Sequence, residues 1–365
     1  MQSVARKLRI GVNALYLIPG GVGGTEVYLR NLLQALAEID AENDYFVFTN
    51  RETARDLVPA NRNFHWMPQA VAASSRPARI LWEQTILPMR VAGLGLDVLL
   101  NPGYTSPLLC PCPTVTVFHD LQHLRHPEYF GFAELLALRL LLWISVHRSR
   151  KLIAVSETTR RDLVKFYGIE DRRVETILHG VNPAFFELEH IDSDPFLLCV
   201  AANRKHKNLG RLIRAFAAFR GDQRLIIAGL RGPDSESLEK LIQELGLTES
   251  VELTGWIPEE RLLDYYGRAH AVVYPSMFEG FGMPVLEALA CGLPTACSDI
   301  SPLREVGGDA VLYFDPLDEV ALARALDRIC NDAELRGRLS REGRLRARQF
   351  TWQNAAKATL AVLKS

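Results

Sequence analysis

Residues 271–299 have the sequence AVVYPSMFEGFGMPVLEALACGLPTACSD, and this stretch decides the fold class. The apolar, β-branched run at 271–274 predicts a buried strand, and residues 294–297 predict the next one. Between them, two glycines allow a sharp turn, and the apolar spacing over 285–290 predicts a helix. Gly292 and Pro294 end this helix. A strand–helix–strand unit of this kind is typical of a parallel α/β sheet.

The loop before the predicted helix, MFEGFG at 277–282, lies where α/β sheets bind anions. We expect phosphate there, because the free N–H groups and the macrodipole of a helix N-terminus both face the ligand. Glu279 and Glu287 flank these donors. Since a carboxylate repels phosphate, we expect both to accept hydrogen bonds from hydroxyl groups, which favours a sugar diphosphate nucleotide. The alternative is that Glu279 only caps the helix and Glu287 is a surface charge.

Length and composition indicate a two-domain protein. A chain of 365 residues exceeds what one hydrophobic core usually supports. The formal net charge is −1, and basic and acidic residues are nearly balanced in both halves, so we expect no nucleic-acid binding. The six cysteines have no zinc-site spacing, and we expect no metal and no cofactor. The N-terminal apolar run is too short for a signal peptide, so we expect a cytoplasmic protein.

The sequence SMFEGFGMPVLEALACGLP at 276–294 resembles the E-x7-E signature of the retaining glycosyltransferases of the GT-B fold, family 4 (glycosyl transferases group 1). The resemblance implies that Glu279 contacts the donor sugar and that Glu287 contacts the ribose. It also places Gly280, Phe281 and Gly282 in the donor site. The resemblance covers essentially the whole chain and is greatest to bacterial mannosyltransferases.

Two motifs in the first half carry the same resemblance. Gly23 and Gly24 lie in a G-G-T-E loop after the first predicted strand, and the resemblance implies that this loop approaches the donor phosphates or the acceptor. His119 follows the predicted strand 114–118, at the ligand edge of a parallel sheet. By itself such a histidine is more often a structural hydrogen bonder, but the resemblance implies contact with the donor hexose. His123 and His126 suit the acceptor instead.

The second half adds basic residues and loops. The loop NRKHKN at 203–208 follows a predicted strand and suits a diphosphate leaving group. Lys207 matches the family lysine, whereas the family arginine is displaced. Arg204 is the best substitute for it, with Lys205 and His206 as alternatives. The resemblance further implies that Gly229 turns over the phosphates and that Trp256 and Ile257 lie under the nucleobase.

Three further segments affect the domain organisation. Residues 132–146 form the most apolar predicted helix, which we expect to be buried beside the sheet; the alternative is an interfacial helix that reaches a lipid-linked acceptor. Residues 184–195 have no periodicity and mark the domain boundary. Asp192 and Asp194 within them form a D-x-D pair, for which we expect no metal. The resemblance implies that the helix 352–365 crosses back to the first domain.

We therefore predict an α/β protein of GT-B fold, with two Rossmann-like domains, 1–185 and 195–350, facing across a cleft. As the resemblance implies, it transfers a hexose, with mannose from GDP-mannose as the first candidate, from a nucleotide diphosphate sugar to a glycan or lipid-linked acceptor with retention. Such transfer serves polysaccharide or glycolipid biosynthesis, with possible peripheral contact at the inner membrane face. The alternatives are a nucleotide-sugar epimerase of the same fold and a non-catalytic two-domain sugar-binding protein.

Overall fold

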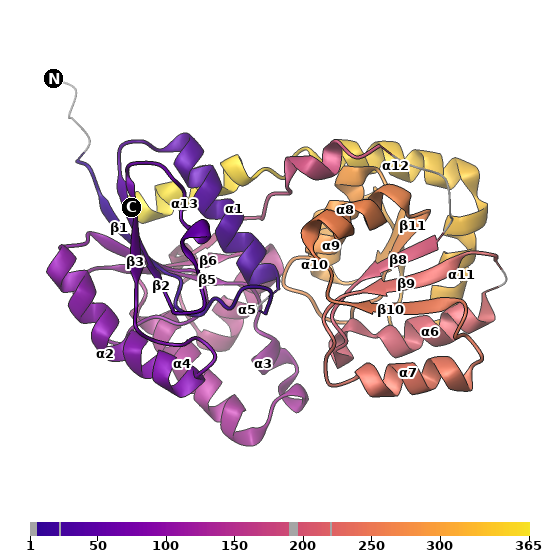
Figure 1. Cartoon of the computed structure of the whole chain (residues 1–365), viewed down its shortest axis with the longest axis horizontal. Helices are drawn as coiled ribbons and strands as arrows, with labels where there is room; N and C mark the ends of the chain where they lie inside the picture. The colour runs from indigo at the N-terminus through magenta and orange to yellow at the C-terminus, as the bar shows by residue number, and fades with distance from the viewer. Residues whose placement is uncertain (1–5, 22, 190–195, 220) are drawn as a thin grey trace. The chain divides into compact units, whose positions relative to one another are not determined.

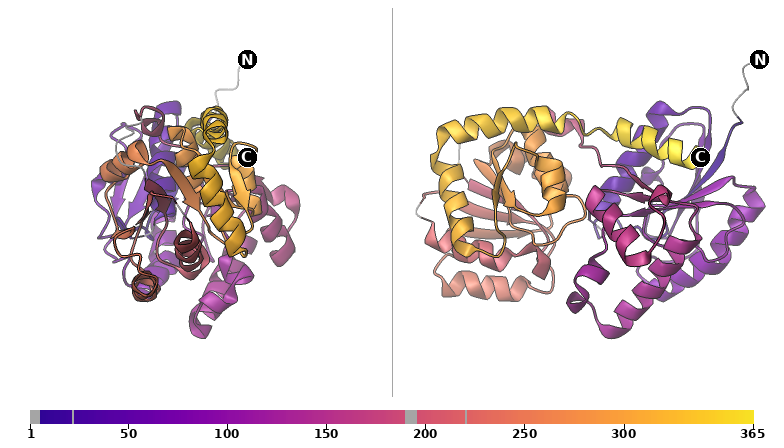
Figure 2. Two further views of the ribbon diagram at one scale, coloured as in Figure 1. Left: turned by 90° about the vertical axis from the view of Figure 1, so that its right-hand side faces the viewer. Right: turned by 180° about the vertical axis from the view of Figure 1, so that it is seen from behind.

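The computed structural model describes residues 6–21, 23–189, 196–219 and 221–365 (Figures 1 and 2). The chain forms two compact units. Unit 1 comprises Met1–Gly180 and Thr351–Ser365, and unit 2 comprises Val181–Phe350. The D-x-D pair at Asp192 and Asp194 lies outside the described residues.

Unit 1 is a parallel sheet with helices on both faces. Its strand order, within the described residues, is β3-β2-β1-β4-β5-β6-β7, and every pairing is parallel. Figure 1 shows α1 and α13 on one side of this sheet and α2 and α4 on the other. The strands are β1 (Arg9–Asn13), β2 (Asp44–Thr49), β3 (Phe64–Pro68), β4 (Val98–Asn101), β5 (Thr114–Phe118), β6 (Lys151–Ala154) and β7 (Val174–Thr176). The described α-helices are α1 (Gly24–Ile39), α2 (Arg76–Leu94), α3 (Gln122–Arg125), α4 (Phe132–Arg148), α5 (Glu157–Tyr167) and α13 (Trp352–Lys364).

Unit 2 repeats this architecture. Its described sheet has the order β10-β9-β8-β11-β12-β13, again parallel throughout. The strands are β8 (Phe196–Val200), β9 (Arg224–Ala228), β10 (Val251–Gly255), β11 (Ala271–Tyr274), β12 (Thr295–Ser298) and β13 (Leu312–Phe314). The helices in the part described are α6 (Leu209–Ala218), α7 (Ser235–Glu244), α8 (Glu259–Arg268), α9 (Met283–Cys291), α10 (Ser301–Gly307), α11 (Glu319–Asn331) and α12 (Ala333–Ala347). The prediction of two Rossmann-like α/β domains is confirmed.

The strand order positions the ligand edge of each sheet. In both sheets the order reverses beside the first strand of the unit, between β1 and β4 and between β8 and β11. A doubly wound sheet opens a crevice at such a switch point, outside the carboxyl ends of the strands. In unit 2 the two loops at this point are the basic loop after β8 and the glutamate loop after β11. The topology therefore places two separately predicted segments side by side.

The division between the units falls at Gly180 and Val181, before the segment 184–195 that we expected to be the boundary. The Val181 N–H donates to the Phe350 carbonyl at 3.2 Å, and the short 3₁₀ turn Pro183–Phe186 packs against α9. These contacts make residues 181–186 part of unit 2. At the other end of the chain, α13 packs against α1 in unit 1.

The expectation that the apolar helix 132–146 is buried is wrong. Of α4, only Leu142, Ser145 and Val146 are buried, and half of its remaining large apolar side chains are exposed. The sequence misleads here because α4 is apolar around most of its circumference, so periodicity does not identify its inner face. None of the described helices is long and apolar enough to cross a bilayer.

Candidate functional site

The site in unit 2 is built by two loops that are hydrogen-bonded to each other. The loop after β8 ends in Asn208, whose left-handed backbone (φ 59°) begins α6. The Asn208 side-chain amide donates to the carbonyls of Pro275, at 3.1 Å, and Pro316, at 2.8 Å. In the opposite direction, the Met277 N–H donates to the His206 carbonyl at 2.7 Å. These bonds fix the basic loop against the glutamate loop.

Lys207, Tyr274 and Glu279 form one constellation at this junction. Lys207 Nζ donates to Glu279 Oε1 at 2.6 Å and to the Tyr274 hydroxyl at 2.9 Å. The Tyr274 hydroxyl itself donates to Glu279 Oε1 at 2.7 Å. The Lys207 and Glu279 side chains are only 16% and 12% exposed, so this ion pair is largely shielded from water. The structure thus brings together the lysine and the glutamate that the sequence predicted separately.

The surroundings keep Glu279 ionised. Burial opposes its ionisation, but the Lys207 charge and the hydrogen bonds from Lys207, Ser276 and Tyr274 outweigh burial and lower its pKa. Burial and the neighbouring carboxylate raise the pKa of Tyr274 well above its ordinary value, so its hydroxyl stays a neutral donor. One Glu279 oxygen is therefore held by two donors, and the anionic carboxylate can also accept hydrogen bonds from ligand hydroxyls.

Glu287 lies in the second turn of α9 and is almost fully buried. Its Oε2 accepts a hydrogen bond from the Tyr266 hydroxyl at 2.9 Å, and Tyr266 is completely buried. Burial and the Glu287 charge raise the pKa of Tyr266 well above its ordinary value. Neither alternative from the sequence holds: Gly282, not Glu279, is the N-cap of α9, and Glu287 is no surface charge.

The loop between the two glutamates has a backbone that requires glycine. Gly282 has φ 112°, and a Cβ there would lie 2.4 Å from Leu303 Cδ2. Phe281 is buried and packs edge-on against Phe350 with ring centroids 6.2 Å apart. Its side chain therefore belongs to the core of unit 2, so the loop offers a ligand the backbone of Phe281 rather than its ring. Gly280 is partly exposed beside it.

The other predicted donor residues lie along the carboxyl edge of the same sheet. Arg204 and Lys205 are exposed in the loop after β8, whereas His206 is partly buried. Gly229, directly after β9, lies so close to the end of β8 that a Cβ would be 2.3 Å from the Ala201 carbonyl oxygen. Trp256 follows the edge strand β10 with an exposed indole, and Ile257 is partly buried.

In unit 1, His119 lies in a cluster of buried rings after β5. Its ring centroid is 4.9 Å from that of Tyr28, 5.3 Å from that of Tyr104 and 5.8 Å from that of His179. The His119 Nε2 is 2.8 Å from the Pro102 carbonyl, which fixes the tautomer with a proton on Nε2. Burial lowers the pKa of His119 to about 4, so the ring is neutral at pH 7.

His179 also packs into this cluster. Its ring centroid is 5.6 Å from that of Trp352 at the start of α13. Burial, followed by the nearby His119, lowers its pKa well below the ordinary value. The adjacent Gly180 is required because a Cβ would lie 2.1 Å from the Trp352 backbone nitrogen. Gly23 is the exposed N-cap of α1 with φ 58°, and Gly24 is its exposed first residue.

The sequence did not identify three polar partners. Tyr274 and Tyr266, which hold the two glutamates, resemble ordinary apolar positions of a strand and a helix. Glu83 of α2 is buried in unit 1, where its Oε2 accepts from Asn13 Nδ2 at 3.3 Å and from Thr105 Oγ1 at 3.0 Å. Burial raises the pKa of Glu83. Buried carboxylates are rare outside functional or paired positions, but this helix was not predicted.

Among the described side chains, no group of three or more His, Cys, Asp or Glu could hold a metal ion. The arrangement at the switch point of unit 2 instead offers a cation, helix N–H groups and two anionic acceptors. This combination suits a ligand that carries both phosphate and hydroxyl groups.

The two Rossmann-like units define the GT-B class of glycosyltransferase folds. Residues 22–185 match the family model described as Glycosyltransferase Family 4, and residues 182–346 match Glycosyl transferases group 1. The chain therefore belongs to the group 1, family 4 glycosyltransferases.

Curated relatives include enzymes of polysaccharide assembly. The chain is 29% identical over 266 residues to the O-antigen chain mannosyltransferase B of Escherichia coli, covering 68% of this chain and 70% of that protein. It is 31% identical over 245 residues to the O-antigen chain mannosyltransferase RfbU of Salmonella typhimurium, covering 65% and 68%.

Solved structures share the fold over almost the whole chain. The sucrose-phosphate synthase of Thermosynechococcus elongatus superposes with a TM-score of 0.80 at 20% identity, covering 98% of both chains. Anabaena Alr3699/HepE in complex with UDP-glucose gives a TM-score of 0.77 at 17% identity, covering 98% of this chain and 99% of that one.

Proposed function

We propose that this glycosyltransferase transfers mannose from GDP-mannose to a glycan or lipid-linked acceptor in polysaccharide or glycolipid biosynthesis, with retention of anomeric configuration. The observation that carries the proposal is the Lys207–Tyr274–Glu279 constellation at the switch point of unit 2. It combines the cation that a diphosphate needs with an ionised acceptor for sugar hydroxyls. Similarity to O-antigen mannosyltransferases supports mannose as the sugar.

Each residue of unit 2 then has a distinct part in donor binding. Lys207 and Arg204 neutralise the departing diphosphate, assisted by the N–H groups at the start of α9. Glu279 accepts hydrogen bonds from the sugar as positive charge develops at the anomeric carbon. Glu287 accepts from the ribose hydroxyls. Gly229 lets the backbone approach the phosphates, and Trp256 and Ile257 lie beside the nucleobase.

Retention is proposed to arise from attack on the same face of the sugar that the leaving diphosphate departs from. A double displacement would need a free nucleophilic carboxylate near the anomeric carbon. Glu279 is poorly suited to that role, because two donors already stabilise the negative charge on its Oε1. The leaving phosphate can instead accept the proton of the incoming hydroxyl group. In unit 1, the neutral His119 retains Nδ1 as an acceptor for a hydroxyl group. We propose that the reaction needs no metal ion.

A donor panel tests this proposal. The protein is incubated with GDP-mannose, GDP-glucose, UDP-glucose or UDP-galactose and a mannose-containing oligosaccharide acceptor, and free nucleoside diphosphate is measured. GDP release that depends on GDP-mannose and acceptor is expected, with chelator having no effect. NMR of the product then gives its anomeric configuration. Faster turnover with a UDP-sugar would overturn the donor assignment, and conversion of the donor without an acceptor would indicate the epimerase instead.

A further inference from the structure

The outer face of α4 is an exposed apolar stripe in unit 1. The exposed fractions of its side chains are 86% for Phe132, 61% for Leu136, 59% for Leu140 and 53% for Trp143. These residues are four, four and three positions apart, which confines the stripe to roughly a quarter of the helix circumference. Single exposed apolar residues are ordinary, but four aligned ones indicate an interaction surface.

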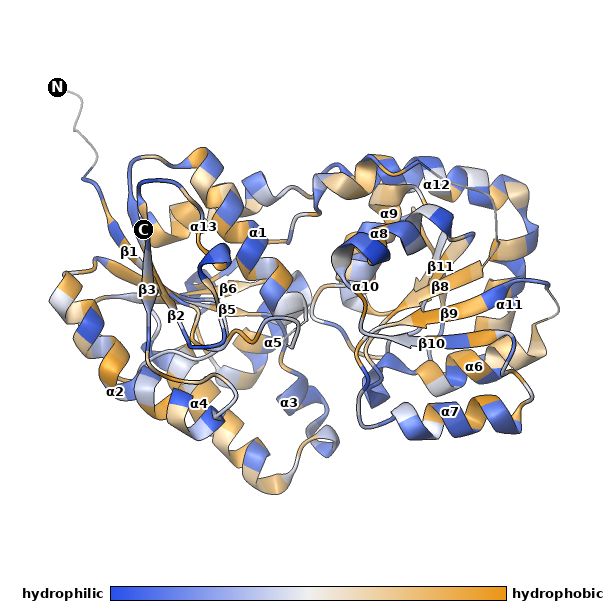
Figure 3. Cartoon of the chain, viewed as in Figure 1, coloured by the Kyte–Doolittle hydropathy of each residue, from blue (hydrophilic) through white to orange (hydrophobic). Residues whose placement is uncertain are grey.

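Neighbouring segments of unit 1 extend this stripe. Leu81 and Met89 of α2 are 65% and 69% exposed, and Leu108 and Leu109 of the loop after β4 are exposed as well. Hydrogen bonds hold the three segments together. Arg76 of α2 pairs with Glu134 of α4 at 2.8 Å, the Leu108 N–H donates to Gln84 Oε1 of α2 at 2.8 Å, and the Ser106 N–H donates to Ser145 Oγ of α4 at 2.9 Å. Figure 3 shows apolar residues recurring along α2 and α4.

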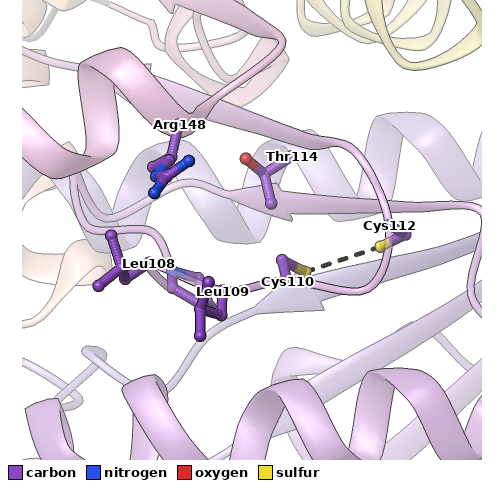
Figure 4. Close-up of a pocket in the computed structure, with 7 residues that line it drawn as sticks. Leu108, Leu109, Cys110, Cys112, Thr114 and Arg148 are labelled. Carbon is purple, nitrogen blue, oxygen red and sulfur yellow. Dashed lines mark hydrogen bonds between the residues drawn. The ribbon is translucent and has the colours of Figure 1, made fainter.

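The charges around this surface are predominantly positive. Helices α2 and α4 carry five arginines and two glutamates, of which Glu83 is buried and Glu134 is paired with Arg76. Arg139 and Arg148 are exposed on α4, and Arg90 is exposed on α2. Arg148, Leu108 and Leu109 are among the residues that line a pocket of about 210 Å³ (Figure 4). The segment 101–113, which leads from β4 to β5, has no charged residue.

We propose that unit 1 docks on an anionic phospholipid surface through this patch, which comprises the exposed apolar side chains of α4 and α2 together with Leu108 and Leu109. An interfacial helix needs one apolar face beside cationic side chains, since the apolar groups enter the acyl boundary and the cations contact anionic headgroups. Stacking of His147 on Trp143, with ring centroids 4.3 Å apart, gives the C-terminal end of the stripe the amphipathic aromatic character typical of a membrane interface.

A second copy of this chain fits the patch less well. A symmetric dimer would place the same surface on both sides of the interface, so the arginines of the two copies would face one another without acidic partners. An anionic lipid surface satisfies the same cations. Docking uses the outer face of α4 and its neighbours and does not depend on the proposed transfer reaction, so the two proposals can fail independently.

Vesicle binding of the full chain tests the docking proposal. Vesicles of phosphatidylglycerol and phosphatidylcholine are expected to co-sediment the protein, whereas pure phosphatidylcholine binds it more weakly. The double substitution Leu136→Ser and Leu140→Ser is expected to weaken binding by at least about tenfold, because it removes apolar area that the membrane would bury. Leu317→Ser with Leu345→Ser is the matched control, since these two leucines are equally exposed in unit 2.

Two further measurements distinguish a lipid surface from a second copy of the chain as the partner of this patch. Acyl-chain-brominated lipids are expected to quench tryptophan fluorescence in the wild type but not in Trp143→Phe. Arg139→Gln with Arg148→Gln is expected to remove most of the salt sensitivity of binding. Equal vesicle binding by the α4 serine variant and its control would overturn the proposal. So would a wild-type dimer that the serine variant converts to monomer and that does not bind vesicles.

Discussion

Lys207 Nζ lies 2.6 Å from Glu279 Oε1, and these two residues come from loops 72 positions apart that follow adjacent strands of the unit 2 sheet. The pair is largely buried, and the pKa of Glu279 is lowered because the Lys207 charge and the hydrogen bonds to the carboxylate outweigh burial. A phosphate that binds near Lys207 therefore also changes the electrostatic potential at Glu279. This relationship means that substitutions at the two positions should not act independently.

Substitutions of the two glutamates are expected to change different kinetic constants. Glu279→Gln removes an acceptor that is strengthened as the anomeric carbon gains positive charge, so kcat should fall by roughly 100-fold with little loss of nucleoside diphosphate affinity. Glu287→Gln weakens a contact to ribose that scarcely changes during reaction, so KM should rise instead. Steady-state kinetics and calorimetric titration of GDP would measure both. Wild-type affinity and rate in both variants would refute both roles.

Lys207→Ala is expected to lose about 2–4 kcal/mol of transition-state stabilisation. It should also destabilise the fold by about 3 kcal/mol, because Glu279 would stay buried without its cation. Adding Glu279→Gln should recover most of the stability but none of the activity. Thermal unfolding and kinetics of the single and double variants form the cycle, and additive stability effects would contradict the coupling.

Arg204→Ala is the companion test of the basic loop. Because Arg204 is exposed, Arg204→Ala is expected to slow turnover with little effect on thermal stability. Lys205→Ala is the matched control, because Lys205 is the exposed neighbour in the same loop. A larger loss of kcat/KM in Lys205→Ala than in Arg204→Ala would reassign the diphosphate contact to Lys205.

The low pKa of His119 gives a pH-dependence with a defined sign. The unfolded chain binds a proton at His119 below about pH 6.5, whereas the folded chain does so only near pH 4. The unfolded state therefore binds more protons between these values, and the His119 contribution to stability is lost as pH falls through this window. His119→Asn should flatten this part of the stability profile. Denaturant unfolding at pH 7 and pH 4.5 measures the difference, and an unchanged slope would contradict the assignment.

The sequence predicts buried central strands well. The predicted bounds of β5 and β11 agree with the structure, because strands covered on both faces appear as continuous apolar runs between turn residues. The strands that were not predicted are at the sheet edges. Only the first residue of β3 is buried and the strand ends in Pro68, whereas β13 has only three residues. The helix α2 was not predicted because Pro88 interrupts its pattern.

The candidate site likewise contains residues that the sequence predicted and residues that it did not. The sequence pointed to Glu279 and Lys207 because they lie in loops at strand ends and because both loops resemble family motifs. It did not show that Tyr274 joins them, because a tyrosine that ends an apolar strand is equally suited to the core. The direction of the Phe281 ring was also beyond prediction, since only the folded loop determines whether it faces a ligand or Phe350.

The two unpredicted tyrosines provide a matched pair of substitutions. Each is buried and donates one hydrogen bond to one of the two glutamates, from Tyr274 to Glu279 at 2.7 Å and from Tyr266 to Glu287 at 2.9 Å. A change to Phe removes only the hydroxyl group, so the packing of the ring is kept. Each variant leaves one carboxylate less firmly positioned, because it loses a hydrogen bond with a net free energy of about 1 kcal/mol.

Tyr274→Phe should therefore lower kcat by roughly fivefold, whereas Tyr266→Phe should raise KM and weaken GDP binding by a similar factor. Tyr274→Phe should also raise the pKa of Glu279, because it removes a hydrogen bond that stabilises the anion, and so shift the acid limb of the kcat profile to higher pH. Tyr266→Phe keeps the Tyr274 hydrogen bond to Glu279 and should leave this limb unchanged. A pH profile that shifts equally in both variants, or a KM effect in Tyr274→Phe alone, would show that the two glutamates do not divide sugar and ribose between them.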